Sequence, residues 1–316
     1  MKPRALKSIR QERPLTAEDR ARHLPVNQPA GQPDASALAI RMNSTYLEMV
    51  DGYYGDRGIL SIFGVFFLTA VCAAWLASLY ITVFYNYLNP DWDRHDEVPL
   101  LVTMVVVTVI IALFVFIFLA FYRWSGEWFG YTHYPIRLNR RNRMVYVFRG
   151  DGTVLETPWD STYFTLYVVK NVAGMRTLGI CGLVMKDAQT VQEQFFFGYS
   201  SPKKEDCLRH WEFMRRYMED GPQAVLNAEG FRYCLPIADR KETAYQGWVV
   251  LVSNDAWNPV IKWLMFPLHV LFFIGRLVWR AVSRTPLWPA DVVAACRIEA
   301  GDPFVRDSST NPPGFQ

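Results

Sequence analysis

The chain has 316 residues, of which 51% are hydrophobic and 15% aromatic, and its formal net charge is +3. This composition is too apolar for an intrinsically disordered protein. So small a net charge, without a basic stripe interleaved with aromatic residues, argues against a nucleic-acid-binding surface. The five cysteines are scattered and never spaced as Cys-x-x-Cys, which gives neither a disulfide framework nor a zinc site. We therefore expect reduced, structural thiols.

The first 40 residues carry basic side chains but no apolar run. Between residues 14 and 33 four prolines interrupt this polar stretch, which is typical of neither a signal peptide nor a helix. They are Pro14, Pro25, Pro29 and Pro33. We expect residues 1–40 to form a disordered, solvated basic tail, and residues 41–58 to form a juxtamembrane segment.

Two long apolar runs predict transmembrane helices. Residues 58–90 contain no formal charge over 33 positions, and residues 98–122 contain none over 25. A bilayer core needs only about 20 helical residues. Neither run shows a polar face at helical spacing, and Tyr and Trp side chains cluster at both ends of the pair, as at lipid headgroup depth. We expect transmembrane helices at 59–87 and 98–122.

The loops predict the orientation of these helices. The connecting loop, residues 88–97, holds four acidic residues and one Arg, whereas residues 1–58 hold nine Lys or Arg and residues 123–149 hold six Arg. By the positive-inside rule the connecting loop lies outside. A loop this short joins two helices only as an antiparallel hairpin. The N-terminus and the large C-terminal part therefore share the cytoplasmic side.

The outer loop holds the best candidate for metal binding or proton uptake. The side chains in this loop that could bind a metal ion or take up a proton are Asp91, Asp93, His95, Asp96 and Glu97. A short acidic loop is more often simply solvated and topology-setting. Neither transmembrane run carries Asp, Glu, Lys, Arg or His, which argues against a channel or pump formed by these helices alone.

The sequence contains none of the common catalytic signatures. It lacks a Gly-x-x-x-x-Gly-Lys phosphate loop, a Gly-x-Ser-x-Gly elbow and a His-Glu-x-x-His zinc pair. His133 and His210 have no nucleophile or paired acid nearby in the sequence, so we expect structural or solvated histidines. We predict no catalytic residue, no metal and no cofactor.

After the second apolar run the pattern changes to that of strands. Short alternating or aromatic and β-branched runs predict strands at 144–149, 153–157, 162–169, 178–185 and 190–199. Gly150-Asp151-Gly152 predicts a hairpin turn because Gly and Asp accept a positive φ. Asn139 to Asn142 predicts another turn.

One amphipathic helix follows the strands. We expect Ser201 as its N-cap, Pro202 as its first residue and Gly221 as its C-terminal stop. Four apolar residues recur at helical spacing and would pack on the sheet: Leu208, Trp211, Met214 and Met218. Four basic residues would face water: Lys203, Lys204, Arg209 and Arg216. A small antiparallel sheet closed by a helix, over residues 134–221, is similar to the pleckstrin-homology-like domains found beside bacterial membrane helices.

A third apolar stretch, residues 257–284, follows an extension over 222–256 and precedes a C-terminal tail over 285–316. Only 13 consecutive residues, 263–275, are uncharged, which is short for a span. In a helix, five polar side chains would fall on one stripe: Lys262, His269, Arg276, Arg280 and Arg284. This pattern predicts an in-plane or re-entrant helix, bent near Pro267, whose stripe contacts the membrane interface or a partner. The alternative is that its apolar face docks on the sheet domain.

Several local strings resemble a proteobacterial membrane family, domain of unknown function family 6708. They are residues 51–58 (Asp-Gly-Tyr-Tyr-Gly-Asp-Arg-Gly), 139–143 (Asn-Arg-Arg-Asn-Arg), 145–146, 150–152, 157–160 and 286–289 (Pro-Leu-Trp-Pro). The resemblance covers most of the chain beyond residue 40. It implies a bacterial inner-membrane setting and, through neighbouring genes, a link to type VI secretion effectors as an immunity or accessory protein. It implies no catalytic residues.

These observations predict a membrane α+β protein and leave two classes of function open. The first is a non-catalytic integral membrane interaction protein, whose partners are membrane lipids and a secreted effector or another membrane protein. The second is a lipid-binding sensor or a lipid-acting enzyme with an unrecognised site. A sensor would use Arg140, Arg141 and Arg143 for headgroup contact, although these arginines also suit the anchoring of topology.

Overall fold

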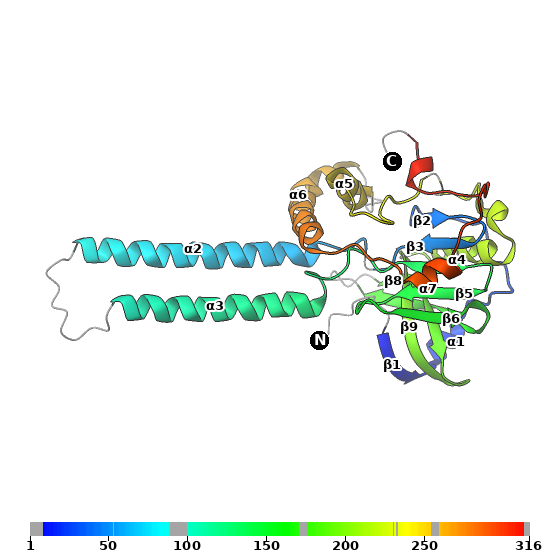
Figure 1. Ribbon diagram of the computed structural model, residues 1–316, viewed down its shortest axis with the longest axis horizontal. Helices are drawn as coiled ribbons and strands as arrows, with labels where there is room; N and C mark the ends of the chain where they lie inside the picture. Colours follow the sequence, from blue (N-terminus) through cyan, green and yellow to red (C-terminus); the bar gives the residue numbers. More distant parts are fainter. Residues whose placement is uncertain are drawn as a thin grey trace. The chain divides into compact units, whose positions relative to one another are not determined.

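The computed structural model describes residues 9–52, 54–88, 100–170, 176–229, 231, 233–253 and 259–312 (Figure 1). The chain divides into two compact units. The sheet domain comprises Met1–Asp56, Tyr131–Gln246 and Arg284–Gln316, and the helical unit comprises Arg57–Gly130 and Gly247–Ser283. The predicted outer-loop residues, from Asp91 to Glu97, lie outside the described residues.

The sheet domain contains nine strands and three of the α-helices among its described residues. In chain order they are β1 (Ile9–Pro14), α1 (Ala17–Ala21), β2 (Ala39–Met42), β3 (Tyr46–Met49), β4 (Ile136–Asn139), β5 (Met144–Phe148), β6 (Val154–Pro158), β7 (Tyr163–Lys170), β8 (Arg176–Met185), β9 (Thr190–Ser201), α4 (Lys204–Glu219) and α7 (Ala290–Ala295). Three short 3-10 helices join them: η2 (Trp159–Ser161), η3 (Pro222–Val225) and η4 (Ser308–Thr310).

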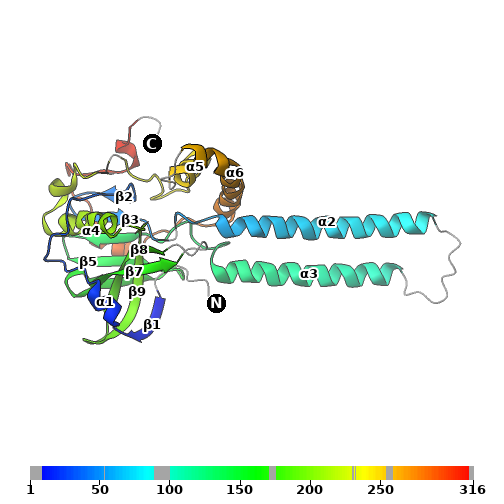
Figure 2. The ribbon, with the colours of Figure 1, turned by 180° about the vertical axis from the view of Figure 1, so that it is seen from behind.

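The strands form two antiparallel sheets. One has the order β1-β9-β8-β7 and the other β2-β3-β4-β5-β6. Figure 2 shows the strong curl of β1 and β9 in the first sheet. The inner faces of both sheets share one hydrophobic core with α4, in which Trp159 and Trp211 stack with ring centroids 5.5 Å apart. The five predicted strands are confirmed as β5 to β9, with ends that differ by at most two residues.

The structure adds four strands that periodicity did not predict, since β1 to β4 are short or lack alternation. Strands β3 and β4 are neighbours in one sheet, with Tyr46 paired to Asn139 and Met49 paired to Ile136. The segment between them, residues 50–135, contains the two longest helices. The pairing of two strands far apart in the sequence therefore brings the two ends of this segment together.

Both predicted turns are confirmed. Gly152 has a φ of +87°, and its N–H donates to the Arg149 carbonyl at 3.0 Å, which closes the β5–β6 turn. Before β5, the Asn139 side-chain oxygen accepts from the backbone N–H groups of Arg141 and Asn142 at 3.0 and 3.2 Å. This side-chain bond replaces a backbone turn bond, as Asn does in Asx-turns.

The predicted disordered tail is folded over its described part. β1 pairs with β9, and Thr16 caps α1 in a reciprocal capping box with Asp19. Leu24 and Ala35 are buried in the main core. The prediction over residues 9–40 is wrong because this segment forms no core of its own and instead supplies backbone bonds and small apolar side chains to elements formed elsewhere.

Helix α4 ends as predicted but begins later. Gly221, with a φ of +92°, follows its end, and its N–H donates to the Arg216 carbonyl at 3.0 Å. The N-cap is Lys203, and Ser201 instead ends β9 and accepts from the Lys203 N–H at 3.1 Å. The first helical residue is Lys204 because Ser201 and Pro202 still belong to the strand end and its turn.

The predicted wet face of α4 is only partly in water. Lys203 and Lys204 are exposed, but Arg209 and Arg216 are half-buried, and Glu212 is fully buried. The N-terminal segment covers this side: the Ala30 N–H donates to Glu212 at 2.8 Å. The predicted apolar face is confirmed, with Trp211, Met214 and Met218 buried and Leu208 packed at the edge of the core.

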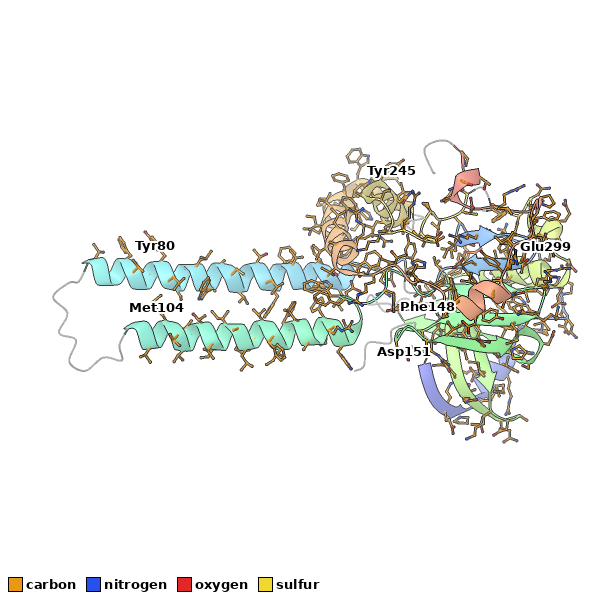
Figure 3. The ribbon with its side chains drawn as sticks, in the orientation of Figure 1. Tyr80, Met104, Phe148, Asp151, Tyr245 and Glu299 are labelled. Carbon is orange, nitrogen blue, oxygen red and sulfur yellow. The ribbon has the colours of Figure 1, made fainter. Side chains whose placement is uncertain are left out.

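The helical unit contains α2 (Ile59–Leu88), α3 (Leu100–Ser125) and α6 (Pro259–Val282), while α5 (Ala244–Ser253) begins in the sheet domain and ends in the helical unit. Helices α2 and α3 run side by side, and Phe67 stacks on Phe118 with centroids 4.5 Å apart. Figure 3 shows side chains projecting from both helices on all sides, among them Tyr80 and Met104.

Three helices are long and apolar enough to cross a membrane: Ile59–Ile81, Met104–Ser125 and Trp263–Val282. The first two correspond to the predicted transmembrane helices. The third is the stretch for which an in-plane or re-entrant helix was predicted, and Pro267 lies inside it. By length and composition, all three helices are therefore candidate spans.

Candidate functional site

The described residues of the helical unit include a buried polar cluster that we name the polar junction. It consists of Arg57, Ser61, Glu127, Trp128, Arg276 and Trp279. These residues come from the start of α2, the segment after α3 and the C-terminal half of α6. Arg57, Glu127 and Trp279 are fully buried, and Arg276 is 1% exposed. Three segments far apart in the sequence therefore meet at charged side chains.

Glu127 ties the end of α3 to the start of α2. Its Oε1 accepts from the Gly58 N–H and from the Ser61 hydroxyl, both at 2.9 Å. The Trp128 indole N–H donates to the same hydroxyl at 2.9 Å. The Arg57 guanidinium lies 4.0 Å from Oε2 of Glu127 and donates to the Gly126 carbonyl at 3.1 Å. A buried carboxylate is tolerated here because backbone, hydroxyl and guanidinium groups all face it.

The α6 side of the junction is built on two glycines. A Cβ on Gly58, whose φ is +92°, would collide with the Arg276 backbone, and a Cβ on Gly275 would come within 3.0 Å of the Ile62 nitrogen. Because neither residue has a Cβ atom, the backbones of α6 and of the start of α2 come into contact. Arg276 then donates to the Arg57 carbonyl at 3.2 Å, and its guanidinium lies 5.3 Å from the Trp279 ring centroid.

The basic stripe predicted for the third apolar stretch does not form one exposed face. His269 and Arg276 are buried, Arg280 is half-buried, and only Arg284, beyond the end of α6, is exposed. The side chain of Lys262 lies outside the described part of the chain. His269 and Arg276 are not exposed as expected, because the contact between Gly58 and Gly275 turns this side of α6 toward α2.

The three arginines predicted for headgroup contact lie at the β4–β5 turn of the sheet domain, and two of them meet carboxylates. Arg143 donates from Nε to Asp160 at 2.7 Å and from Nη2 to Glu219 at 2.8 Å, which holds the pKa of Asp160 below its ordinary value. Arg141 donates to the exposed Glu299 at 3.0 Å. Arg140 lies beside Gly221 at the C-terminal end of α4.

A second buried ion pair lies in the five-stranded sheet. Arg137 Nη2 is 3.3 Å from Glu48, and its guanidinium lies 4.6 Å from the ring centroids of both Tyr46 and Trp288. The Trp288 indole N–H donates to Glu48 at 2.7 Å. This Trp belongs to the Pro-Leu-Trp-Pro string, so that string fastens the C-terminal segment over the sheet.

Residues 111–300 match the model of a family described as "Family of unknown function (DUF6708)". The chain belongs to this family. No curated protein and no solved structure matches the chain.

The DUF6708 match includes Glu127 and Arg276 of the polar junction but not Arg57 or Ser61, which precede it. It also begins after β1, β2 and β3, although β3 pairs with β4 inside the matched region. The match therefore covers less of the N-terminal part than the local strings suggested. The family description assigns no activity, so chemistry has to be judged on the side chains themselves.

The described residues of this DUF6708 protein include buried thiols and buried histidines. They contain no group of three His, Cys, Asp or Glu side chains arranged to hold a metal ion. Burial raises the pKa of Cys207 to about 11 and that of Cys234 to about 12, which keeps both thiols protonated and unreactive. Burial also lowers the pKa of His210 to about 4, so this histidine is neutral at neutral pH.

Sequence reasoning did not single out Glu127 or Ser61. The available signal was weak: Glu127 is the first acidic residue after the second apolar run, and Arg57 is the last charge before the first run. Charges at these positions usually mark a water-facing membrane boundary. Their pairing depends on the return of two helices to one place. The polar junction thus acts as a structural connection among three helices.

Proposed function

We propose that this DUF6708 protein is a non-catalytic integral membrane protein of the bacterial inner membrane, which presents the sheet domain to a protein partner on the cytoplasmic side. The observation that carries the proposal is the pairing of β3 with β4 around the intervening α2 and α3. A pair of spanning helices whose flanking strands are hydrogen-bonded must leave and re-enter the membrane on one side. The arginine-rich flanks favour the cytoplasmic side.

The sheet domain is proposed to be pleckstrin-homology-like. Strands β3 to β6 are consecutive neighbours in one sheet, β7 to β9 are consecutive neighbours in the other, and α4 follows and fills the shared core. Four strands, three strands and a C-terminal helix is the element order expected for that domain class. β1 and β2 extend the two sheets, and the membrane helices are an insertion between the first two strands.

The third candidate span, α6, is proposed not to cross the membrane. Before it, Glu242 accepts from the Tyr54 hydroxyl at 2.6 Å, and after it, the Arg284 carbonyl accepts from the Thr132 N–H at 2.8 Å. Both contacts lie within the sheet domain. One crossing between them would separate the two contacts by a bilayer, and the ten-residue α5, about 15 Å long, is too short to cross back.

A binding surface for the partner is proposed on the C-terminal segment of the sheet domain. The exposed large apolar side chains described there are Leu287, Val293 and Ile298, at 71%, 51% and 38%. Isolated exposed apolar side chains are ordinary, and the proposal is that these three, which lie close in the sequence, act as one contact surface. We propose a secreted type VI effector as this partner, with an immunity or accessory role for the chain.

Topology is tested by labelling single cysteines with a membrane-impermeant maleimide in a Cys72→Ser background. Asp93→Cys should react in cells with a permeabilised outer membrane, and Asp151→Cys should react only after the inner membrane is broken. Reaction of both before breakage would contradict the shared cytoplasmic side. The other four cysteines are buried, which limits background labelling.

The partner is tested by co-purification from detergent-solubilised membranes of the native host. A stoichiometric protein that is lost with Val293→Glu but retained with the matched surface variant Ala188→Glu would support the interaction function. Retention with both variants would move the binding surface elsewhere. Recovery of a specific lipid and no protein would contradict the proposal and favour the lipid-binding sensor or lipid-acting enzyme.

A further inference from the structure

We propose that α6 is an inverted amphipathic helix in the cytoplasmic leaflet, with its charged side turned to the protein and its apolar side bound by lipid acyl chains. The inference rests on the proposed function, in which α2 and α3 span the same membrane. The new element is the ligand of α6, which is the hydrocarbon of a single leaflet, together with the face of the helix that contacts this hydrocarbon.

The outer face of α6 is apolar and strongly exposed. Its exposed large side chains are Trp263, Leu264, Phe266, Leu268 and Ile274, at 78%, 72%, 47%, 42% and 40%. At about 100° per residue, Trp263 and Ile274 lie on the side of the helix opposite Arg276. So continuous an apolar surface on one helix is a site for hydrocarbon rather than water.

The inner face of α6 holds the polar groups. Arg276 binds the Arg57 carbonyl and stacks against Trp279, and His269 is 9% exposed. An ordinary interfacial helix directs its basic side chains to anionic headgroups. In α6 two of these side chains are already inside the protein. Arg280 is half-buried and Arg284, beyond the end of the helix, is exposed, so the binding of α6 to the membrane depends more on apolar contact than on lipid charge.

The depth of α6 is set by its contact with α2. Gly275 lies against Gly58 and Ile62, at the first turn of α2, where the apolar run of that helix starts. The same end of α2 exposes Phe63 and Phe66, so hydrocarbon around α2 begins at this level. Figure 1 shows α6 running steeply across the direction of α2. The exposed face of α6 is thus held beside the entry of α2 rather than along its length.

The test is depth measurement on the full chain, reconstituted into phosphatidylcholine vesicles with and without phosphatidylglycerol. Spin labels are placed one at a time at Leu264→Cys and Ile274→Cys in the Cys72→Ser background. Collision with oxygen reports hydrocarbon, and collision with a water-soluble nickel chelate reports water. Leu76→Cys on α2 and Glu299→Cys on the sheet domain are the hydrocarbon and water references, because both side chains are exposed.

We expect the oxygen-to-nickel ratio at both α6 labels to be several-fold above that at residue 299 and below that at residue 76. The two α6 labels should report similar depths, and phosphatidylglycerol should leave them unchanged. A crossing helix would instead separate the two depths by up to about 15 Å over ten residues, which would overturn the proposal. A nickel-accessible label at residue 264 would also overturn it.

Two further outcomes identify other causes. Labels on α6 that are shielded from both reagents would show a covering protein, such as a second copy of the chain, and would overturn lipid as the ligand. A water-accessible label at residue 76 would show that α2 does not span, so the proposed function itself would fail. Because residues 264 and 274 are exposed, neither label should disturb folding.

Discussion

Helices α4 and α6 have similar sequence patterns but opposite surroundings. Each carries an apolar stripe at helical spacing and a set of basic residues on the other side. In α4 the apolar stripe enters the core of the sheet domain, and Trp211 is fully buried. In α6 the apolar side is outermost, with Trp263 78% exposed, and the buried side carries Arg276.

The difference teaches that an amphipathic pattern identifies two faces but not which of them the protein covers. The polar side of α4 is covered by the N-terminal segment. The buried Glu212 carboxylate there accepts hydrogen bonds from Arg215 and Arg216 at 2.9 and 2.6 Å. The polar side of α6 is covered by the start of α2. Burial of charge is tolerated in both helices because partners reach the charged groups.

The largest expected effect is a difference in folding stability when a tryptophan of α4 and one of α6 are each replaced by alanine. Trp211→Ala should destabilise the sheet domain by about 3–5 kcal/mol, because it leaves a cavity beside Trp159. Trp263→Ala should change folding stability by less than about 0.5 kcal/mol, since the side chain contacts little protein. Hydrogen exchange of the β7–β9 amides in vesicles measures both. Equal losses would show that the outer face of α6 is covered by protein.

A smaller effect is expected where α6 is attached. Glu127→Ala should cost about 3 kcal/mol because the Gly58 N–H and the Ser61 hydroxyl lose their acceptor and the buried Arg57 guanidinium loses the carboxylate 4.0 Å away. Glu127→Gln keeps one carbonyl oxygen and should cost about half as much. Unfolding of α2 and α6 in mixed detergent, followed by circular dichroism, measures both variants. If Gln is as damaging as Ala, charge rather than hydrogen bonding holds the junction.

The smallest effect is a pH dependence within α4. Burial lowers the pKa of His210 from 6.5 to about 4, and its Nδ1 lies 3.2 Å from the Asp34 carbonyl oxygen. The unfolded chain therefore binds a proton first, so stability is complete above pH 6.5 and falls as the pH drops toward 4. The loss between pH 7 and pH 5 should be about 2 kcal/mol.

His210→Gln is the matched control for this prediction, because it removes the titration and keeps a donor for the Asp34 carbonyl. Denaturant titrations at several pH values should show a flatter pH profile for the variant than for the parent protein. An unchanged slope would mean that His210 is not the group that takes up the proton.

Much of the fold follows from local pattern. The strands β5 to β9, their turn at Gly150 to Gly152 and the end of α4 at Gly221 were all predictable, because alternation and positive φ are local properties. β1 to β4 were not predictable, because each has four to six residues and depends on a neighbouring strand for its pairing. The same holds for the N-terminal segment, which folds against β7, β9 and α4.

The sequence by itself determined that α2 and α3 are long apolar helices, since absence of charge over more than 20 residues depends on composition alone. It also determined that α6 is a helix with one charged stripe. Only the tertiary structure decided that Glu127, Arg57 and Arg276 share one site, that β3 pairs with β4 although α2 and α3 lie between them in the sequence, and that His269 and Arg276 of the α6 stripe are buried. These outcomes depend on contacts between segments distant in the chain, in which two glycines allow an approach that no periodicity encodes.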